Sequence, residues 1–437
     1  MNRNFINKYR RAKMEDFIIP ANGQNDDRGV FKYSMPVNAH IFEFLKTYLY
    51  GIHKKVLKNE ELEVLFFHAL KNDIAPVISQ YTISYEDENG LAKIDDWFIH
   101  SKIKYKNENY FISLVIVKDM DRIIYNFNVL GESLSDVNPK KLAEVLIEES
   151  IKNSIYNGKI LKLISKPRSF MPDLDEESPD SLEFEIIKSL NNTAMEDIIL
   201  PQEIKEKLNI FVKAVLRYNE IRKPLRYILS GLPGSGKTKI VKGIANACAG
   251  KATIILTNAG NLPLNMLFSF ANMFEPCIIC IDDLDIAIRE RHETHPRMLS
   301  SFLEHLDGFI KNNVFLLATV NNKRILDFAA SRPGRFDYII DLETLTKKDY
   351  FEIVKLNTKD EKILELFKND DVLDALVAKK AVGAFLVNLI KQIELIKKLN
   401  SGADFSAKDL LNLIKQNYES FYKDKGKSDI GFYSEDL

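Results

Sequence analysis

The strongest constraint on how this 437-residue chain folds is a glycine-rich motif that directly follows an apolar segment. The apolar residues 225–230 are typical of a strand, and helical periodicity begins where the motif ends. A strand, a glycine-rich loop and a helix in this order predict a phosphate-binding loop, because glycines let backbone N–H groups converge on phosphate oxygens at the positive end of the helix. The loop consists of Gly231, Leu232, Pro233, Gly234, Ser235, Gly236, Lys237 and Thr238.

Two further features supply the chemistry that such a loop needs. Lys237 is expected to contact the β- and γ-phosphates of a nucleotide, and the Thr238 hydroxyl is expected to bind magnesium. The apolar residues 277–281 predict a buried strand that ends in Asp282 and Asp283. This strand places Asp282 beside the metal, while Asp283 is positioned to orient and deprotonate the attacking water. The sequence therefore predicts a magnesium-dependent nucleotide site.

Two other motifs have the residue types of redox or metal sites. Cys277 and Cys280 have the spacing of a redox or zinc motif, but residues three apart in a strand face opposite sides, so we expect both thiols in the core. The stretch His-Glu-Thr-His at 292–295 is one residue short of the His-Glu-x-x-His zinc motif. We interpret it as a solvated loop, which argues against a built-in metalloprotease.

Beyond residue 195, apolar strands alternate with helices, which predicts a parallel sheet covered on both faces, an α/β fold of three layers. The expected strands occupy 225–230, 253–256, 277–281, 314–320 and 338–342. After about residue 344 only helical periodicity is found, over 348–356, 362–367, 383–399 and 407–422. We therefore predict an α/β core over 195–344, and a helical lid with a polar tail over 345–437.

The beginning of the chain predicts a separate α+β domain over 1–170. Alternating apolar residues indicate three strands that pair most simply as an antiparallel meander, and apolar residues at helical spacing indicate two helices. The strands are expected over 97–105, 110–117 and 122–129, and the helices over 39–53 and 139–155. Trp97, His100 and the tyrosines of this domain are interpreted as core residues rather than as the lining of a ligand pocket.

An acidic segment separates the two parts of the chain. Residues 171–185 contain seven acidic residues, two prolines and no basic residue, a composition that disfavours a packed element. We therefore predict a linker over 171–194. The domain before it is expected to bind a client or partner.

The composition excludes several classes of protein. With 46% hydrophobic and 28% charged residues, the chain is neither disordered nor fibrous. The 61 basic and 62 acidic residues leave a net charge of -1, so nucleic acid is not an expected partner. Only three cysteines occur, and neither a signal sequence nor an apolar run of about 18 residues is found, so we expect a cytoplasmic protein without a membrane span.

Further motifs follow in a characteristic order over about 197–399. They are Asp-Ile-Ile at 197–199, Asn321 behind an apolar strand, Ser-Arg-Pro-Gly-Arg-Phe-Asp at 331–337, and Gly-Ala at 383–384. Together with the loop and the acid pair, they resemble the AAA clade of AAA+ ATPases. The resemblance implies the P-loop sheet of that fold, with ATP and Mg²⁺ as cofactors.

The same resemblance assigns roles to single residues. It implies that Ile198 and Ile199 border the adenine, and that Asn321 helps to place the attacking water. It also implies that Gly383 and Ala384 form the sensor-2 site, at which this clade has alanine in place of an arginine.

Two arginines receive a role in a neighbouring subunit. The resemblance implies that Arg335 is an arginine finger and that Arg332 lies beside it. A guanidinium also suits the charge that develops on a transferring phosphoryl group. The alternative is that both arginines pair with carboxylates in a polar loop. A finger that acts on a neighbour requires a homo-oligomer, and the resemblance implies a hexameric ring.

The sequence departs from the clade at several points. Asp283 stands where a glutamate is usual, and the shorter side chain withdraws the carboxylate by about an ångström, which can lower a rate by about 10²-fold. Residues 258–267 lack the aromatic residue of a threading pore loop, and we expect Phe268 and Phe270 in a helix core. The segment Leu-Asp-Gly-Phe at 306–309 resembles the subgroup of AAA proteins that includes the mitochondrial Rieske-protein translocase. The resemblance implies that this chain is a soluble relative without a membrane anchor.

The combined prediction is an ATP-hydrolysing, chaperone-like protein that remodels a protein client as an oligomeric ring. The alternative is a nucleotide-controlled assembly scaffold in which Asp283 supports only weak hydrolysis.

Overall fold

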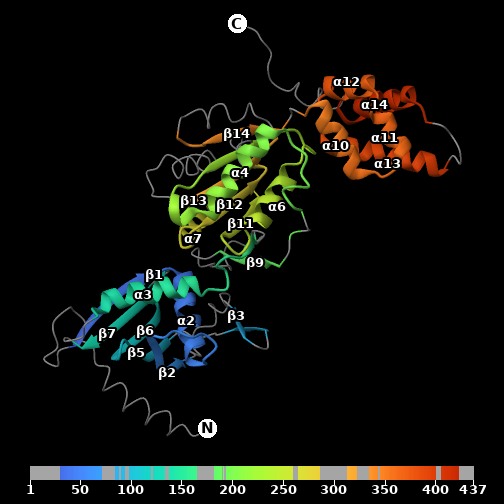
Figure 1. Cartoon of the computed structure of the whole chain (residues 1–437). Coiled ribbons are helices and arrows are strands. Elements are labelled where there is room, and N and C mark those ends of the chain that lie inside the picture. The colour runs from blue at the N-terminus through green and yellow to red at the C-terminus, as the bar shows by residue number, and fades with distance from the viewer. Residues whose placement is uncertain are drawn as a thin grey trace. The chain divides into compact units, whose positions relative to one another are not determined.

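The computed structural model divides into two compact units (Figure 1). The N-terminal unit comprises residues 1–157 and 168–181, and the C-terminal unit comprises residues 158–167 and 182–437. Within them the structure describes residues 30–70, 84–87, 90–93, 98–119, 122–132, 137–164, 182–188, 190, 193–258, 264–285, 313–321, 334–342, 345–399 and 405–422.

The N-terminal unit is built on a five-stranded antiparallel sheet with the strand order β1-β7-β6-β5-β2. Its strands are β1 (Val30–Val37), β2 (Leu62–Leu70), β5 (Phe98–Tyr105), β6 (Glu108–Asp119) and β7 (Arg122–Glu132). The last three form the predicted meander. Between β5 and β6, Lys106 and Asn107 have φ values of 50° and 70°, as a two-residue hairpin turn requires. A separate hairpin joins β3 (Ser84–Asp87) to β4 (Gly90–Lys93).

Two helices, α2 (Ala39–His53) and α3 (Pro139–Lys152), pack on one face of this sheet. The side chains of Asn38 and Asn138 cap them by accepting backbone N–H groups of the first turn. Buried residues of both helices meet alternate strand residues, including the predicted core tyrosines Tyr48, Tyr105, Tyr110 and Tyr125. The prediction was wrong for His100, which is partly exposed because it alternates with Ile99 and Ser101 and so lies on the other face. Trp97 lies outside the described residues.

The C-terminal unit contains a seven-stranded sheet in the order β14-β10-β13-β12-β11-β8-β9. Five of its strands match the predicted ones: β10 (Arg226–Ser230), β11 (Thr253–Asn258), β12 (Cys277–Asp282), β13 (Val314–Val320) and β14 (Tyr338–Asp341). They pair in parallel, which confirms the α/β fold class. Parallel strands point their carboxyl ends to one edge, so the phosphate loop and the acid pair follow at the same edge of the sheet.

The other two strands lie where the sequence predicted the N-terminal domain and the linker. β8 (Ile160–Leu163) runs parallel to β11, and β9 (Phe184–Ile187) runs antiparallel to β8. Ile160 and Leu161 are buried in the sheet, and the Phe184 ring stacks on Phe270 at 4.4 Å between centroids. Each strand has only four residues, too few for a period to stand out from the acidic surroundings.

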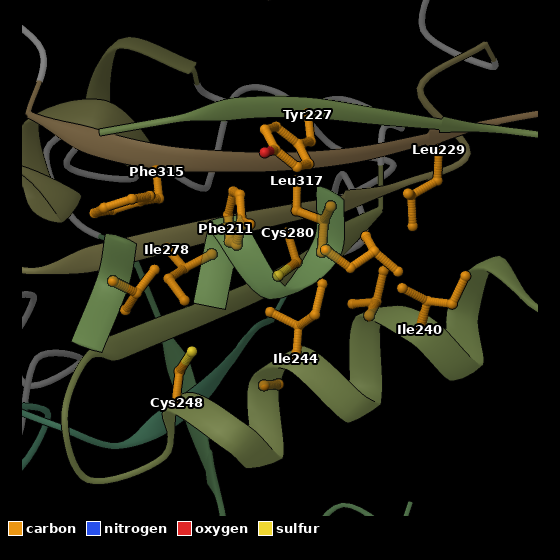
Figure 2. Packing of buried hydrophobic residues seen from close by; sticks show 14 of the residues in the cluster. Phe211, Tyr227, Leu229, Ile240, Ile244, Cys248, Ile278, Cys280, Phe315 and Leu317 are labelled. Atoms are coloured by element: carbon orange, nitrogen blue, oxygen red, sulfur yellow. The ribbon is translucent and has the colours of Figure 1, made fainter. Parts of the chain in front are cut away.

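A hydrophobic core fills one side of this sheet (Figure 2). Ile240, Ile244 and Cys248 of α6 (Lys237–Cys248) pack with residues of β12 and with α4 (Gln202–Leu216). Cys280 belongs to this cluster, whereas the equally buried Cys277 does not, so the two thiols face opposite sides as predicted. Burial raises the pKa of Cys248 to about 12, and it also raises the pKa values of the other two thiols. All three cysteines are therefore protonated core residues.

The remaining helices complete the C-terminal unit. They are α5 (Tyr218–Ile221), α7 (Leu264–Ala271), α10 (Lys347–Asn357), α11 (Glu361–Phe367), α12 (Asp370–Ala378), α13 (Gly383–Leu399) and α14 (Ala407–Tyr422). Phe268 and Phe270 are buried in α7, as predicted. The helices from α10 onward share a hydrophobic core of their own, which we call the lid core. No helix in the described ranges has the length and the apolar character needed to cross a membrane.

Candidate nucleotide-binding site

The phosphate loop connects β10 to α6, as the sequence predicted. Gly234 and Gly236 have φ values of 87° and 100°, a region that residues with a Cβ enter only at a cost. Space is restricted as well. A Cβ added to Gly231 would lie 2.7 Å from Ser235 Oγ, and one added to Gly234 would lie 2.8 Å from the Cβ of Ala384. The glycines are therefore needed both for the backbone conformation and for the close packing around it.

Lys237 holds its ammonium group inside the loop. The residue is only 6% exposed. Its Nζ donates to the carbonyl oxygens of Gly231 at 2.6 Å and Leu232 at 3.2 Å, and to Asn321 Oδ1 at 2.8 Å. The positive charge thus lies between the loop backbone and the end of β13, where the sequence predicted a phosphate-contacting lysine.

The predicted metal ligands meet beside the loop. Thr238 Oγ1 donates to Asp282 Oδ2 at 3.2 Å, although the two residues belong to different elements. Thr319, fully buried in β13, donates its hydroxyl hydrogen to Asp282 Oδ1 at 2.5 Å and accepts the Asp283 backbone N–H at 2.9 Å. Sequence reasoning missed Thr319. The signal was a lone hydroxyl near the end of an otherwise apolar strand, two residues before Asn321.

Asn321 connects the lysine to the second aspartate. Its Oδ1 accepts from Lys237, and its Nδ2 donates to Asp283 Oδ1 at 2.9 Å. Asp283 has φ 51°, a left-handed conformation that costs energy for a residue other than glycine and often marks a functional site. Asp285, also missed by sequence reasoning, is 3% exposed and places Oδ1 3.4 Å from the Asn321 backbone nitrogen. The amide of Asn321 is therefore held in one orientation between opposite charges.

The lid touches the loop through the predicted sensor-2 residues. The Ala384 N–H donates to the Gly234 carbonyl oxygen at 3.1 Å, at the first turn of α13. Gly383 precedes it, and the side chain of Leu232 packs against the lid core. The lid core and the first turn of α13 therefore contact the phosphate loop directly.

The predicted adenine segment packs on α6. Ile198 is 4% exposed and lies in the hydrophobic core, close to Gly243, where a Cβ lies 3.0 Å from Ile198 Cδ1. Ile199 is half-buried. Ile198 therefore serves the core, and contact of either isoleucine with adenine stays a prediction.

The arginine motif is described only in its second half. Arg335 is 5% exposed, so the guanidinium is buried in the single chain rather than displayed on it. Asp337 of the same motif accepts the Arg226 N–H at 2.8 Å and fixes the start of β10. Arg332 lies outside the described residues, as do the stretches 292–295 and 306–309. The role of both arginines as fingers stays a prediction.

The residues present fit a nucleotide phosphate and magnesium. Ser235 Oγ is buried and finds no hydrogen-bond partner in the described part of the chain. A phosphate oxygen bound in the loop would supply the missing acceptor. Thr238 and Asp282 offer oxygen ligands only, which Mg²⁺ prefers. Among the described residues no cluster of three or more metal-binding side chains occurs, and Mg²⁺ at phosphates needs only one or two.

Comparison with known proteins agrees with this geometry. The family described as "ATPase family associated with various cellular activities (AAA)" matches residues 227–344, the segment that carries the loop, the acid pair and Asn321. This segment is similar to AAA ATPase domains. Domains of this family bind ATP with Mg²⁺ and hydrolyse it.

The AAA domain also has relatives among curated proteins. An ATP-dependent zinc metalloprotease FtsH of Pseudothermotoga lettingae is 31% identical over 224 residues, which is 46% of this chain and 34% of that protein. A putative cell division cycle ATPase of Plasmodium falciparum is 29% identical over 312 residues, 64% of this chain and 25% of that protein. The FtsH of Thermus thermophilus is 28% identical over 249 residues, 52% of this chain and 39% of that protein.

These likenesses have clear bounds. The chain spans between 25% and 39% of the length of these three relatives. The FtsH relatives are named as zinc metalloproteases. This sequence, in contrast, has no His-Glu-x-x-His zinc motif. The comparisons show similarity to AAA ATPases at large, and the narrower likeness to the Rieske-protein translocase subgroup stays a prediction.

Proposed function

We propose that this protein hydrolyses ATP with Mg²⁺ and uses the energy to remodel a protein client, as a chaperone-like AAA ATPase. The observation that best supports the proposal is the bridge that Asn321 forms between Lys237 and Asp283. It joins the group that neutralises phosphate charge to the group that activates water. A site that only binds nucleotide needs the first of these groups and not the second.

The side chains divide the work as follows. ATP with Mg²⁺ supplies a transferable phosphoryl group whose charge the metal partly neutralises. Lys237 exchanges its present carbonyl and amide acceptors for phosphate oxygens, and Thr238 with Asp282 holds the metal. Asp283 orients the attacking water and accepts its proton, while Asn321 Nδ2 keeps that carboxylate in place. The hydrogen bonds that already bring these side chains together support this division of roles.

A scaffold with weak hydrolysis remains the second candidate, and one observation favours it. Asp283 is one methylene shorter than the usual glutamate, and its carboxylate is held back by Asn321 at 2.9 Å. A carboxylate drawn away from the water lowers the rate while nucleotide binding persists. In that case the ATP-bound state recruits partners without mechanical work.

We extend the proposal to a homo-oligomeric ring, most simply a hexamer, in which Arg335 and Arg332 serve the nucleotide of a neighbour. Support comes from the AAA domain and from the order of its motifs. Mixing Arg335→Ala subunits with active subunits lowers turnover more than dilution does if the arginine acts in trans. Arg335 is buried in the single chain, so a purely structural arginine instead yields an Arg335→Ala protein that loses stability, with strictly proportional loss of activity in mixtures.

The central test uses the full chain with two variants. Lys237→Ala removes the ammonium and is expected to abolish ATP binding, whereas Asp283→Asn keeps binding but slows hydrolysis and so traps client complexes. Affinity capture with the Asp283→Asn protein then identifies the client. Turnover that rises with the captured client, together with a change in the client's folded or assembled state, supports remodelling. Partner binding that follows ATP occupancy, with no change in the partner, supports the scaffold.

A further inference from the structure

The sheet of the N-terminal unit has a second face that α2 and α3 do not cover. Alternate residues such as Ile103, Ile112 and Val129 belong to the core between the sheet and these helices. The residues between them therefore point to the opposite side, which we call the outer face. Phe111 on this face is 36% exposed, a high value for a phenylalanine in the middle strand of a sheet.

Four residues of the outer face stand in one row across four strands. Lys32 of β1 pairs with Leu130 of β7, Leu130 pairs with Phe111 of β6, and Phe111 pairs with Lys102 of β5. Neighbouring strands are about 4.8 Å apart, so the two lysines stand roughly 14 Å apart, with the exposed Phe111 and the buried Leu130 between them. Lys104 follows Lys102 on the same face. We call these five residues the outer patch.

The outer patch combines positive charge with an apolar centre. Lys102 Nζ lies 5.5 Å from the centroid of the Phe111 ring, so the aromatic face and the ammonium are presented together. Lys32 is exposed on the other side of the row. One acidic residue, Glu63, lies opposite Lys104 among the outer-face side chains that the structure describes. The three lysines of the outer patch therefore outnumber the carboxylate beside them.

We propose that the outer patch docks the client through a short segment in which an apolar side chain is flanked by acidic residues. This rests on the proposed function, because it names the surface and the chemistry by which the N-terminal unit selects its client. The apolar side chain covers the exposed Phe111 ring, and the carboxylates reach Lys32 on one side and Lys102 with Lys104 on the other. Burial of the exposed ring supplies affinity, and the charges supply orientation.

The number of positive charges and aromatic rings in the outer patch favours a protein segment over single-stranded nucleic acid as the partner. Nucleic-acid sites that bind well commonly neutralise about six to ten phosphates, and they stack several bases on several aromatic rings. The outer patch offers three lysines and one exposed ring, the neighbouring Phe66 opposite Lys102 is partly buried, and Glu63 opposes part of this charge. A short acidic and apolar segment matches the number of groups that are present.

The test measures binding of the full chain to a labelled peptide with a central Leu-Phe pair flanked by Asp and Glu. Lys102→Gln combined with Lys104→Gln is expected to weaken binding about tenfold, since two surface ion pairs are lost. Phe111→Ser is expected to weaken it about tenfold or more, since an interface anchor is lost. The matched control, Lys140→Gln with Lys141→Gln, removes two exposed lysines from α3 and leaves binding unchanged.

Comparison probes decide the partner class. A peptide with Asn and Gln in place of its acids, and one with Ser in place of Leu-Phe, both bind more weakly if the proposal holds. Equal binding of all peptides, equal loss in the α3 control, or tighter binding of oligothymidylate than of the acidic peptide overturns it. Unchanged thermal unfolding of each variant shows that the fold is intact.

ATP turnover separates this proposal from the proposed function. The outer-patch variants keep the basal ATPase rate and lose stimulation by the client. If the captured client stimulates turnover equally in these variants, the docking surface is refuted while remodelling stands. If the acidic peptide binds at the outer patch but no client changes state, docking stands and remodelling fails.

Discussion

Replacing Thr319 by valine tests whether the hydroxyl that sequence reasoning missed organises the acid pair. The substitution keeps the shape of the side chain and removes one donor and one acceptor. Two hydrogen bonds disappear, from Thr319 Oγ1 to Asp282 Oδ1 and from the Asp283 N–H to Thr319 Oγ1 at 2.9 Å. Valine keeps the methyl group of threonine and places a second methyl group where the hydroxyl was, so packing in the fully buried site changes little.

The expected cost follows from these two bonds. A hydrogen bond to a carboxylate is worth about 1.5–3 kcal/mol, and a buried N–H left without an acceptor costs about 1–3 kcal/mol. Asp282 and Asp283 are both partly exposed, so water replaces part of the loss and the lower ends of these ranges apply. Their sum is about 2.5 kcal/mol, which corresponds to a melting temperature lower by roughly 5–10 °C for a unit of this size.

The assay is thermal unfolding of the nucleotide-free protein, followed by titration of ATP at several Mg²⁺ concentrations. Thr319→Val is expected to unfold earlier and to need more Mg²⁺ for the same ATP occupancy, because Asp282 loses a fixed partner. Thr319→Ser is the matched control, since it keeps the hydroxyl and loses only a methyl group. A valine variant that is as stable as wild type, or a serine variant that needs more Mg²⁺ than the valine variant for the same ATP occupancy, refutes the reasoning.

Three further outcomes follow from the structure. Asp283→Glu restores the missing methylene and should raise the single-turnover hydrolysis rate by up to about 10²-fold; no increase shows that side-chain length is not limiting. Gly234→Ala should destabilise the protein more than Gly236→Ala in thermal unfolding, because both glycines have positive φ but only at Gly234 does the new Cβ meet Ala384, at 2.8 Å. Burial lowers the pKa of His40 from 6.5 to about 4, so the unfolded state binds the proton first as the pH falls. Stability of the N-terminal unit should therefore be constant above about pH 6.5 and fall by up to about 3 kcal/mol toward pH 4, with a flatter profile in His40→Gln.

Local patterns in the sequence were sufficient to predict the phosphate loop, the acid pair and the five central strands. Each depends on residues that are close together in the chain. The glycines at 231, 234 and 236 permit the loop backbone, and continuous apolar runs specify strands that are buried on both faces. Burial of Cys277 and Cys280 on opposite faces followed from the period of a strand in the same way.

Two features depended on tertiary structure because their parts are distant in sequence or too short to show a period. The four-residue strands β8 and β9 become strands by pairing at the edge of the sheet, next to β11, and an acidic composition concealed them. His100 faces outward because its neighbours Ile99 and Ser101 take the core positions. Neither outcome can be read from residues within a few positions.

The connections within the site were also decided by the fold. The sequence predicted one site for Lys237, Asp283 and Asn321, since each follows a strand of the same parallel sheet. It did not determine that the Asn321 amide joins the other two, or that Thr319 holds both aspartates. Those hydrogen bonds depend on the lateral order of β10, β13 and β12, which brings side chains up to 84 positions apart within hydrogen-bonding distance. Strand order is a property of the whole sheet, and no local sequence pattern encodes it.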